Sequence, residues 1–69
     1  MTNTQGTMRD LRYAAKAAAT LADGDNFLAT RRRDNLVRLA ESQGVTIPEL
    51  AAATGLTRKA IRRIVHQYR

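Results

Sequence analysis

The amino-acid sequence predicts an all-α fold, a small bundle of about four helices that ends in two short helices joined by a tight corner. Three observations lead to this prediction. The first third of the chain is rich in alanine and other strong helix formers. In the last third, apolar residues recur at the i, i+3, i+4 spacing of a buried helix face. Glycines beside capping residues divide the chain into segments of helical length.

The size and composition of the chain exclude several classes of protein. The 69 residues form one small domain, which buries about 60% of its unfolded surface. Such a domain has no room for a deep substrate cavity, and the sequence offers no nucleophile–base pair. We therefore expect neither an enzyme nor a small-molecule ligand. Cysteine is absent and histidine occurs once, so we also expect no disulfide, no metal site and no cofactor.

The charge of the chain points to a polyanionic partner. Its formal net charge is +6 and its pI is about 11.2. No apolar run reaches the length of a membrane span, and the polar N-terminus has no signal peptide. We therefore expect a cytoplasmic, nucleoid-associated protein with no membrane partner.

The apolar residues expected in the core are spread along the whole chain. They are Leu11, Leu21, Phe27, Leu28, Leu36, Val37, Leu39, Val45, Ile47, Leu50, Leu56, Ile61, Ile64 and Val65. Because a core of this size stabilises only marginally, dimerisation would be a natural supplement.

The chain is expected to begin with a flexible leader over 1–6, which shows no apolar periodicity. A single helical domain over 7–69 follows, and its first helix, over 7–22, has Thr7 as candidate N-cap. The apolar seam of this helix is mostly alanine: Met8, Leu11, Ala15, Ala18 and Ala22, widened by Ala14 and Leu21. Since alanine buries little area, the seam would be weak alone but would let another helix approach closely. We take helix 8–22 as the candidate surface for a homodimer.

The next expected feature is a helix break at 23–26, Asp-Gly-Asp-Asn. Gly24 can end the first helix, and Asp25 or Asn26 can cap the next. The alternative is one long helix through this point. The second helix is expected over 26–43, with Gly44 at its end, and its predicted buried residues are Leu28, Ala29, Leu36, Leu39 and Ala40.

Three consecutive arginines occur in this second helix. Arg31, Arg32 and Arg33 cannot share one face, because successive residues diverge by about 100°. Arg32 lies nearest the apolar stripe, so its stem is expected to pack there. The other two are solvent-directed or paired, for instance with Asp34. A solvated charge run and phosphate contact both remain open for these arginines.

The last segment, 47–68, carries the start and stop signals of two short helices. Pro48 suits the first turn of a helix, and Ile47 before it is expected to lie outside the α region. Gly55 supplies the positive φ that a chain needs to leave a helix sharply. Thr57 is then a candidate N-cap for the second helix of the pair.

The final helix, 58–68, is divided by chemistry. Its buried stripe is expected to consist of Ile61, Ile64, Val65 and Tyr68. Its cations, Lys59, Arg62 and Arg63, project away from that stripe with His66, and no acid follows Glu49 in the sequence. A helix with clustered cations and a rigid apolar back fits the DNA major groove in width and in charge.

These residues resemble a known family. The stretch Leu-Ala-Ala-Ala-Thr-Gly-Leu-Thr over 50–57, followed by Ala60, Ile61 and Ile64, is similar to the helix-turn-helix signature of bacterial and phage DNA-binding proteins. The likeness is greatest to the resolvase-like and sigma-factor region-4-like variants, and it covers about half the chain, roughly 34–69. Thr54 stands where many members have an apolar residue.

The resemblance implies a set of DNA-contacting residues: Thr57, Arg58, Lys59, Arg62, Arg63 and His66. Helical geometry alone indicates nearly the same set. Arg62 and Arg63 are the best candidates for bidentate contacts to guanine, whereas Arg58 at the flank is suited to a phosphate.

The leading hypothesis is a sequence-selective protein that binds double-stranded DNA, a small bacterial or phage transcriptional regulator. The alternative is a protein-interaction module that presents the alanine-rich first helix to a partner. A general RNA or membrane-surface binder ranks last, because the chain has few aromatic residues and no long hydrophobic face. The target sequence, and whether the protein activates or represses, do not follow from the residues.

Overall fold

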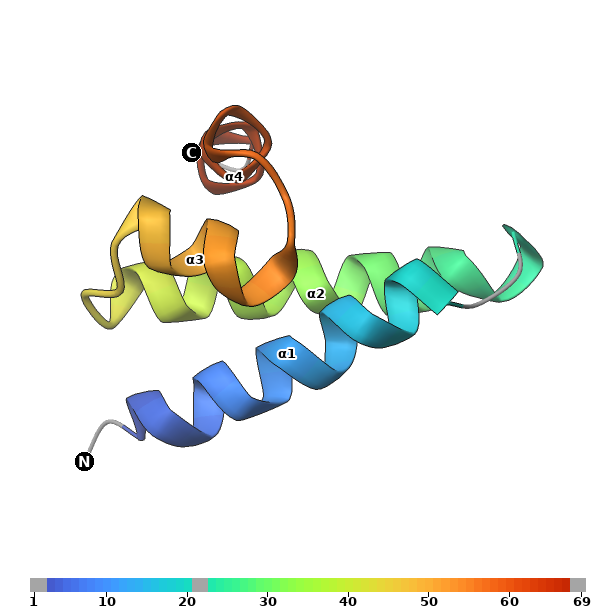
Figure 1. The fold of residues 1–69 in the computed structure, drawn as a ribbon, viewed down its shortest axis with the longest axis horizontal. Coiled ribbons are helices and arrows are strands. Elements are labelled where there is room, and N and C mark those ends of the chain that lie inside the picture. The colour runs from blue at the N-terminus through green and yellow to red at the C-terminus, as the bar shows by residue number, and fades with distance from the viewer. Residues whose placement is uncertain (1–2, 21–22, 68–69) are drawn as a thin grey trace.

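The computed structural model describes residues 3–20 and 23–67, which form four α-helices (Figure 1). They are α1 (Thr4–Thr20), α2 (Asp23–Ser42), α3 (Ile47–Thr54) and α4 (Arg58–His66). These described residues contain no strand, so the predicted all-α bundle is confirmed. None of the helices is long and apolar enough to cross a membrane within the described ranges.

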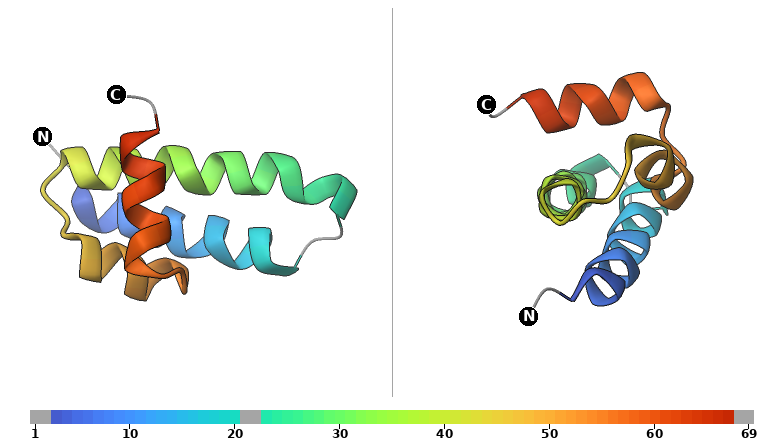
Figure 2. Two further views of the ribbon diagram at one scale, coloured as in Figure 1. Left: turned by 90° about the horizontal axis from the view of Figure 1, so that it is seen from above. Right: turned by 90° about the vertical axis from the view of Figure 1, so that its left-hand side faces the viewer.

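The four helices are arranged in three levels. In Figure 1, α1 is the lowest level and forms an antiparallel hairpin with α2. α2 and α3 lie beside each other at the middle level, and α4 crosses above them (Figures 1 and 2). α1 contacts α2 and α3, and α4 contacts α2 and α3, but α1 and α4 do not meet within the described residues. α2 and α3 therefore separate the first helix from the last.

Each helix contributes one large, fully buried side chain to the core. Leu11 of α1, Val37 of α2, Leu50 of α3 and Ile61 of α4 are all completely shielded from solvent. The other buried residues of this core are Ala40, Val45, Ile64 and Val65. Because burying one such side chain contributes about 1.5–3 kcal/mol, the contact among these four residues is the main force that unites the helices.

The first helix begins earlier than the sequence predicts. Asn3 caps α1, since its Oδ1 accepts a hydrogen bond from the N–H of Gly6 at 2.9 Å. The predicted cap, Thr7, is instead a buried residue of the helix whose hydroxyl donates to the carbonyl of Asn3 at 3.0 Å. The leader predicted over 1–6 is therefore wrong for its last three residues, which are helical.

The predicted break between the first two helices is confirmed, but its position is wrong. α1 ends at Thr20 and α2 begins at Asp23, so Gly24, Asp25 and Asn26 belong to the first turns of α2. The backbone of the predicted break is therefore helical from Asp23 onward. The predicted apolar positions Leu21, Ala22 and Tyr68 lie outside the described residues.

The buried face of α2 agrees with the prediction only in part: Ala40 is buried and Leu36 is partly buried as predicted, but Leu28 and Leu39 are exposed. Phe27 is 65%, Leu28 73% and Leu39 46% exposed, whereas Val37 and Ala40 are buried. At 100° per residue, Leu28 and Leu39 point almost opposite to Val37. The right-hand view of Figure 2 shows the reason: α1, α3 and α4 surround α2 on one side and leave its other side uncovered.

The alanine seam of α1 packs inside the molecule. Leu11, Ala14, Ala15 and Ala18 are buried, Met8 is partly buried against the core, and α1 contacts only α2 and α3 among the helices. The seam predicted as a dimer or partner surface is therefore already covered by the chain itself.

Candidate nucleic-acid interface

The corner between α3 and α4 has the predicted glycine geometry. Gly55 adopts φ 75° and ψ 7°, the left-handed conformation, and its N–H donates to the carbonyl of Ala51 at 2.9 Å. An L-residue with a Cβ is disfavoured there, which is why helices so often end on glycine. Only Gly55, Leu56 and Thr57 connect the two helices, so α4 starts directly from this reversal.

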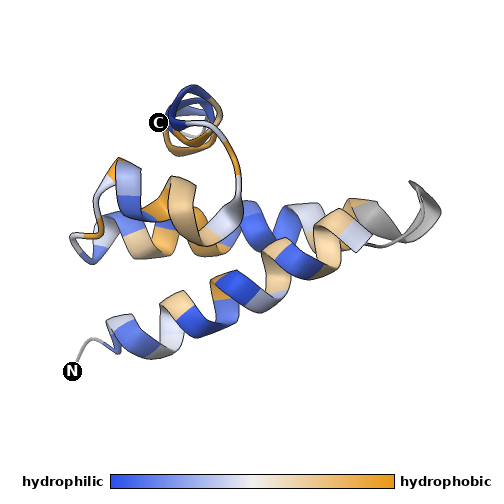
Figure 3. Cartoon of the chain, in the orientation of Figure 1, coloured by the Kyte–Doolittle hydropathy of each residue, from blue (hydrophilic) through white to orange (hydrophobic). Residues whose placement is uncertain are grey.

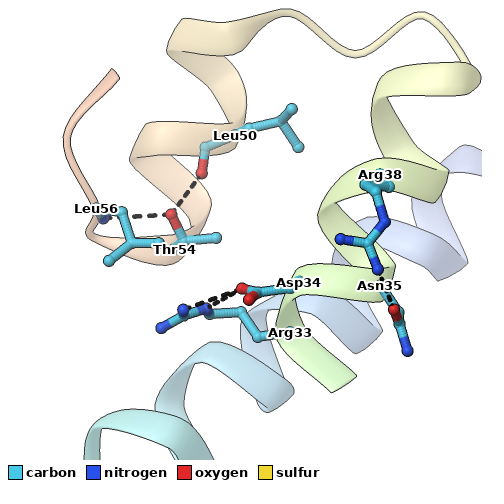
Figure 4. A network of polar contacts seen from close by, with 7 residues as sticks. All are labelled: Arg33, Asp34, Asn35, Arg38, Leu50, Thr54 and Leu56. Carbon is cyan, nitrogen blue, oxygen red and sulfur yellow. Dashed lines mark hydrogen bonds and ion pairs between the residues drawn. The ribbon is translucent and has the colours of Figure 1, made fainter. Parts of the chain in front are cut away.

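Thr54, the residue directly before the helix-ending glycine, reinforces the corner. The hydroxyl of Thr54 donates to the carbonyl of Leu50 at 2.8 Å and accepts from the N–H of Leu56 at 3.2 Å (Figure 4). It thereby satisfies one backbone group of the helix end and one of the turn. Sequence reasoning missed this role, although a threonine directly before the helix-ending glycine is the signal that could have revealed it.

The beginning of α3 differs by one residue from the prediction. Thr46, not Ile47, is the N-cap: it has φ −80° and ψ 158°, and its Oγ1 accepts from the N–H of Glu49 at 3.4 Å. The same hydroxyl donates to Oε1 of Glu49 at 2.9 Å. Ile47 is the first helical residue, so Pro48 occupies the first turn as predicted.

α4 starts as the sequence predicts. Thr57 is its N-cap, with φ −73° and ψ 158°, and its Oγ1 accepts from the N–H of Ala60 at 3.1 Å. The Thr57 hydroxyl thus accepts a hydrogen bond that stabilises the helix start. It donates no hydrogen bond to any residue that the structure describes.

The two faces of α4 have opposite chemistry. Ile61, Ile64 and Val65 are buried against α2 and α3. All the predicted contact residues are exposed: Thr57, Arg58, Lys59, Arg62, Arg63 and His66. Figure 3 shows the helix almost end-on, with its hydrophobic side toward the core and its hydrophilic side outward. The structure therefore brings the six predicted residues together on one open face.

No acid compensates the cations of this face. α4 contains no acidic residue, and neither Arg62 nor Arg63 forms an ion pair with any residue that the structure describes. α1 lies on the far side of α2 and α3, so it does not cover them. The exposed flank of α4 is consequently a concentrated positive surface on a rigid element.

The three arginines of α2 have different surroundings. Arg33 is largely buried and donates to Oδ1 of Asp34 from Nε at 3.1 Å and from Nη2 at 3.0 Å. Arg32 is exposed and lies beside Leu28 and Leu36 of the predicted stripe, whereas Arg33 is on the side of α2 that contains the buried Val37. Arg31 lines a shallow hollow of about 310 Å³ together with Gln67, at the end of α4.

The described residues contain no group of three or more potential metal ligands. Comparison of the chain with protein-family models, with curated proteins and with solved structures found no match. The geometry of α4 and of the corner that holds it is thus the basis for the functional proposal.

Proposed function

We propose that the chain is a sequence-selective protein that binds double-stranded DNA, a small transcriptional regulator of the bacterial or phage type. The observation that carries the proposal is the division of α4 into a buried aliphatic stripe and an open cationic flank. No other helix of the described residues covers that flank. α4 itself is held by its packing on α2 and α3 and by the Thr57 cap at its first turn.

The dimensions of α4 suit the major groove of B-DNA. An α-helix with its side chains is about 10–12 Å wide, and the groove is about 12 Å wide. The nine residues of α4 span about 13 Å, enough to reach base edges over several base pairs. α3 would lie behind it against the backbone, where Thr46 and Glu49 hold its first turn.

The six exposed residues divide into two roles. Arg62 and Arg63 extend from the middle of α4 and are the best placed for bidentate contacts to guanine, with Lys59 and His66 beside them. Thr57 and Arg58 stand at the helix start, where backbone N–H groups and the helix dipole favour a phosphate. The Thr57 hydroxyl would donate a hydrogen bond to the same phosphate.

The test is selection of a site from a random duplex library, followed by affinity measurements on the double variant Arg62→Ala/Arg63→Ala. Each lost bidentate contact should remove about 1–3 kcal/mol of discrimination, so preference for the selected site should disappear. Circular dichroism should show unchanged helicity, because both side chains are exposed and alanine favours helix.

The matched control is Arg31→Ala/Arg32→Ala, which removes the same charge from exposed positions of α2. It should weaken binding to selected and unrelated duplexes by the same factor, because its effect is electrostatic. Unchanged affinity of Arg62→Ala/Arg63→Ala for the selected site would refute the proposal.

A second candidate function is a protein-interaction module, which the exposed apolar side of α2 favours. Leu28 and Leu36 line a groove of about 520 Å³ with Arg31, Arg32 and Asn35. This groove replaces the alanine seam of α1 as the candidate partner surface, since the seam is buried. Stoichiometric binding of one protein that is lost in Leu28→Gln, with no DNA shift even at low salt, would favour this function over DNA binding.

A further inference from the structure

α1 carries a second cationic stripe that the proposed role of α4 does not use. Arg9, Arg12 and Lys16 are exposed, and Tyr13 among them is 72% exposed. These four side chains line one shallow hollow of about 240 Å³. Tyr13 is too exposed to contribute to the core, and together with the three cations it is available to an external ligand.

The position of this stripe follows from how α1 packs. Its buried residues Leu11, Ala14 and Ala18 face α2 and α3, and Arg9 and Lys16 lie on the opposite side of the helix. α4 packs on the other side of α2 and α3 and does not meet α1 within the described residues (Figures 1 and 2). The two cationic faces therefore point away from each other.

We propose that the α1 stripe binds the phosphate backbone of a second DNA duplex, so that one molecule bridges two duplexes. The bridge rests on the proposed binding of the first duplex by α4. The α1 stripe itself supplies only backbone contacts, and it would not select a sequence.

The chemistry of the stripe matches a row of phosphates. Arg9 and Lys16 are seven residues apart, or about 10 Å along the helix, which corresponds to about three base-pair steps along one strand. Arginine and lysine neutralise phosphates, and the hydroxyl of Tyr13 is a phosphate donor of the kind common at DNA backbones.

Two acids lie near the stripe and reduce its positive charge. Asp10 approaches Nε of Arg9 at 3.8 Å, and Glu49 shares a neighbouring hollow with Arg12. Glu49 also accepts a hydrogen bond from Thr46. The stripe is therefore less positive than the flank of α4, and we expect it to bind a duplex more weakly and to release it at lower salt.

The molecule is thick enough to hold two duplexes apart. Its principal extents are 34 × 23 × 20 Å, so duplexes on opposite faces are separated by about 20 Å of protein. At 0.15 M salt the Debye length is about 8 Å, and repulsion across that gap is largely screened.

The experiment is a capture assay with the full chain. A duplex with the α4-selected site is fixed to beads and saturated with protein, and a labelled unrelated duplex is then added at increasing salt. Wild type should retain the labelled duplex. Arg12→Ala/Lys16→Ala should retain much less at equal occupancy of the beads, with the slope of log K against log salt reduced by about 1.8 for two lost contacts.

The matched control is again Arg31→Ala/Arg32→Ala, which removes two charges from α2. At equal occupancy its capture should fall only by the general electrostatic factor, and therefore by less than the capture by Arg12→Ala/Lys16→Ala. Both altered positions of α1 are exposed, and circular dichroism checks that the helix persists. Undiminished capture by Arg12→Ala/Lys16→Ala would overturn the bridge, because the second duplex would then be held by something other than the α1 stripe.

Absence of capture by wild type that still binds the bead duplex selectively would also overturn the bridge, while the proposed function of α4 stood. Loss of selectivity on the beads in wild type would instead overturn that function. Equal retention of labelled double-stranded RNA, or of phosphatidylserine vesicles, would overturn DNA as the ligand of the α1 stripe.

Discussion

The α3–α4 corner and the helix α2 were specified in different ways. At the corner, Thr46, Gly55 and Thr57 each set the backbone of their own neighbourhood through one or two hydrogen bonds or a positive φ. α2 has leucines on two sides, and only the placement of the other helices decides which side is buried. Local signals therefore specify the corner, but they do not decide which face of a two-sided helix enters the core.

The largest expected effect compares the same substitution in the two regions. Leu50→Ala, at the fully buried position of α3, should cost about 2–5 kcal/mol of the free energy of unfolding through lost burial and a cavity. Leu28→Ala on the exposed side of α2 should change it by less than about 0.5 kcal/mol. Urea unfolding followed by circular dichroism measures both, and equal losses would contradict the described packing of α2.

A smaller effect is expected at the turn. Gly55→Ala places a Cβ in open space, with no atom within 4 Å, so its cost of about 1–2 kcal/mol comes from the left-handed backbone alone. Gly55→Asn should cost less, because asparagine tolerates this conformation better. Thermal unfolding of the two variants measures the difference. An alanine variant as stable as wild type would show that the corner does not depend on a positive φ.

The smallest expected effect on the free energy of unfolding comes from removing a threonine hydroxyl. Thr54 and Thr20 both donate to a carbonyl in their own helix, so they can be compared directly. Thr54→Val leaves the N–H of Leu56 without its partner and should cost about 1 kcal/mol. Thr20→Val removes only an exposed hydroxyl bonded to the carbonyl of Lys16, and should be nearly neutral. Chemical denaturation of the pair tests this, and equal behaviour would remove Thr54 from the account of the corner.

The sequence was most informative where side chain and backbone interact within a few residues. The Gly55 turn, the Thr57 cap and the division of α4 into buried and exposed faces all followed from local patterns, and the structure confirms them. The exposure of the six predicted contact residues followed for the same reason, since one strongly amphipathic helix contains nearly all of them.

Other features depended on contacts between distant segments. The choice of Val37 over Leu28 as a buried residue of α2 required knowing that α1, α3 and α4 gather on one side. The start of α1 at Thr4 was missed because Asn3 and Thr7 are both good capping residues, and only tertiary packing buries Thr7. The Thr54 hydrogen bonds were missed because an apolar residue was expected at this position. Its hydroxyl reaches the N–H of Leu56 only once the corner has formed.

The shortness of α4 has a consequence for how this protein can change. Nine residues are too few for a helix to persist alone in water, so α4 exists as a helix only because Ile61, Ile64 and Val65 anchor it. Its outward side chains take no part in that anchoring. They can be exchanged as a set for other polar residues while the molecule keeps its shape, so the α4 surface can acquire a new specificity at little cost to folding.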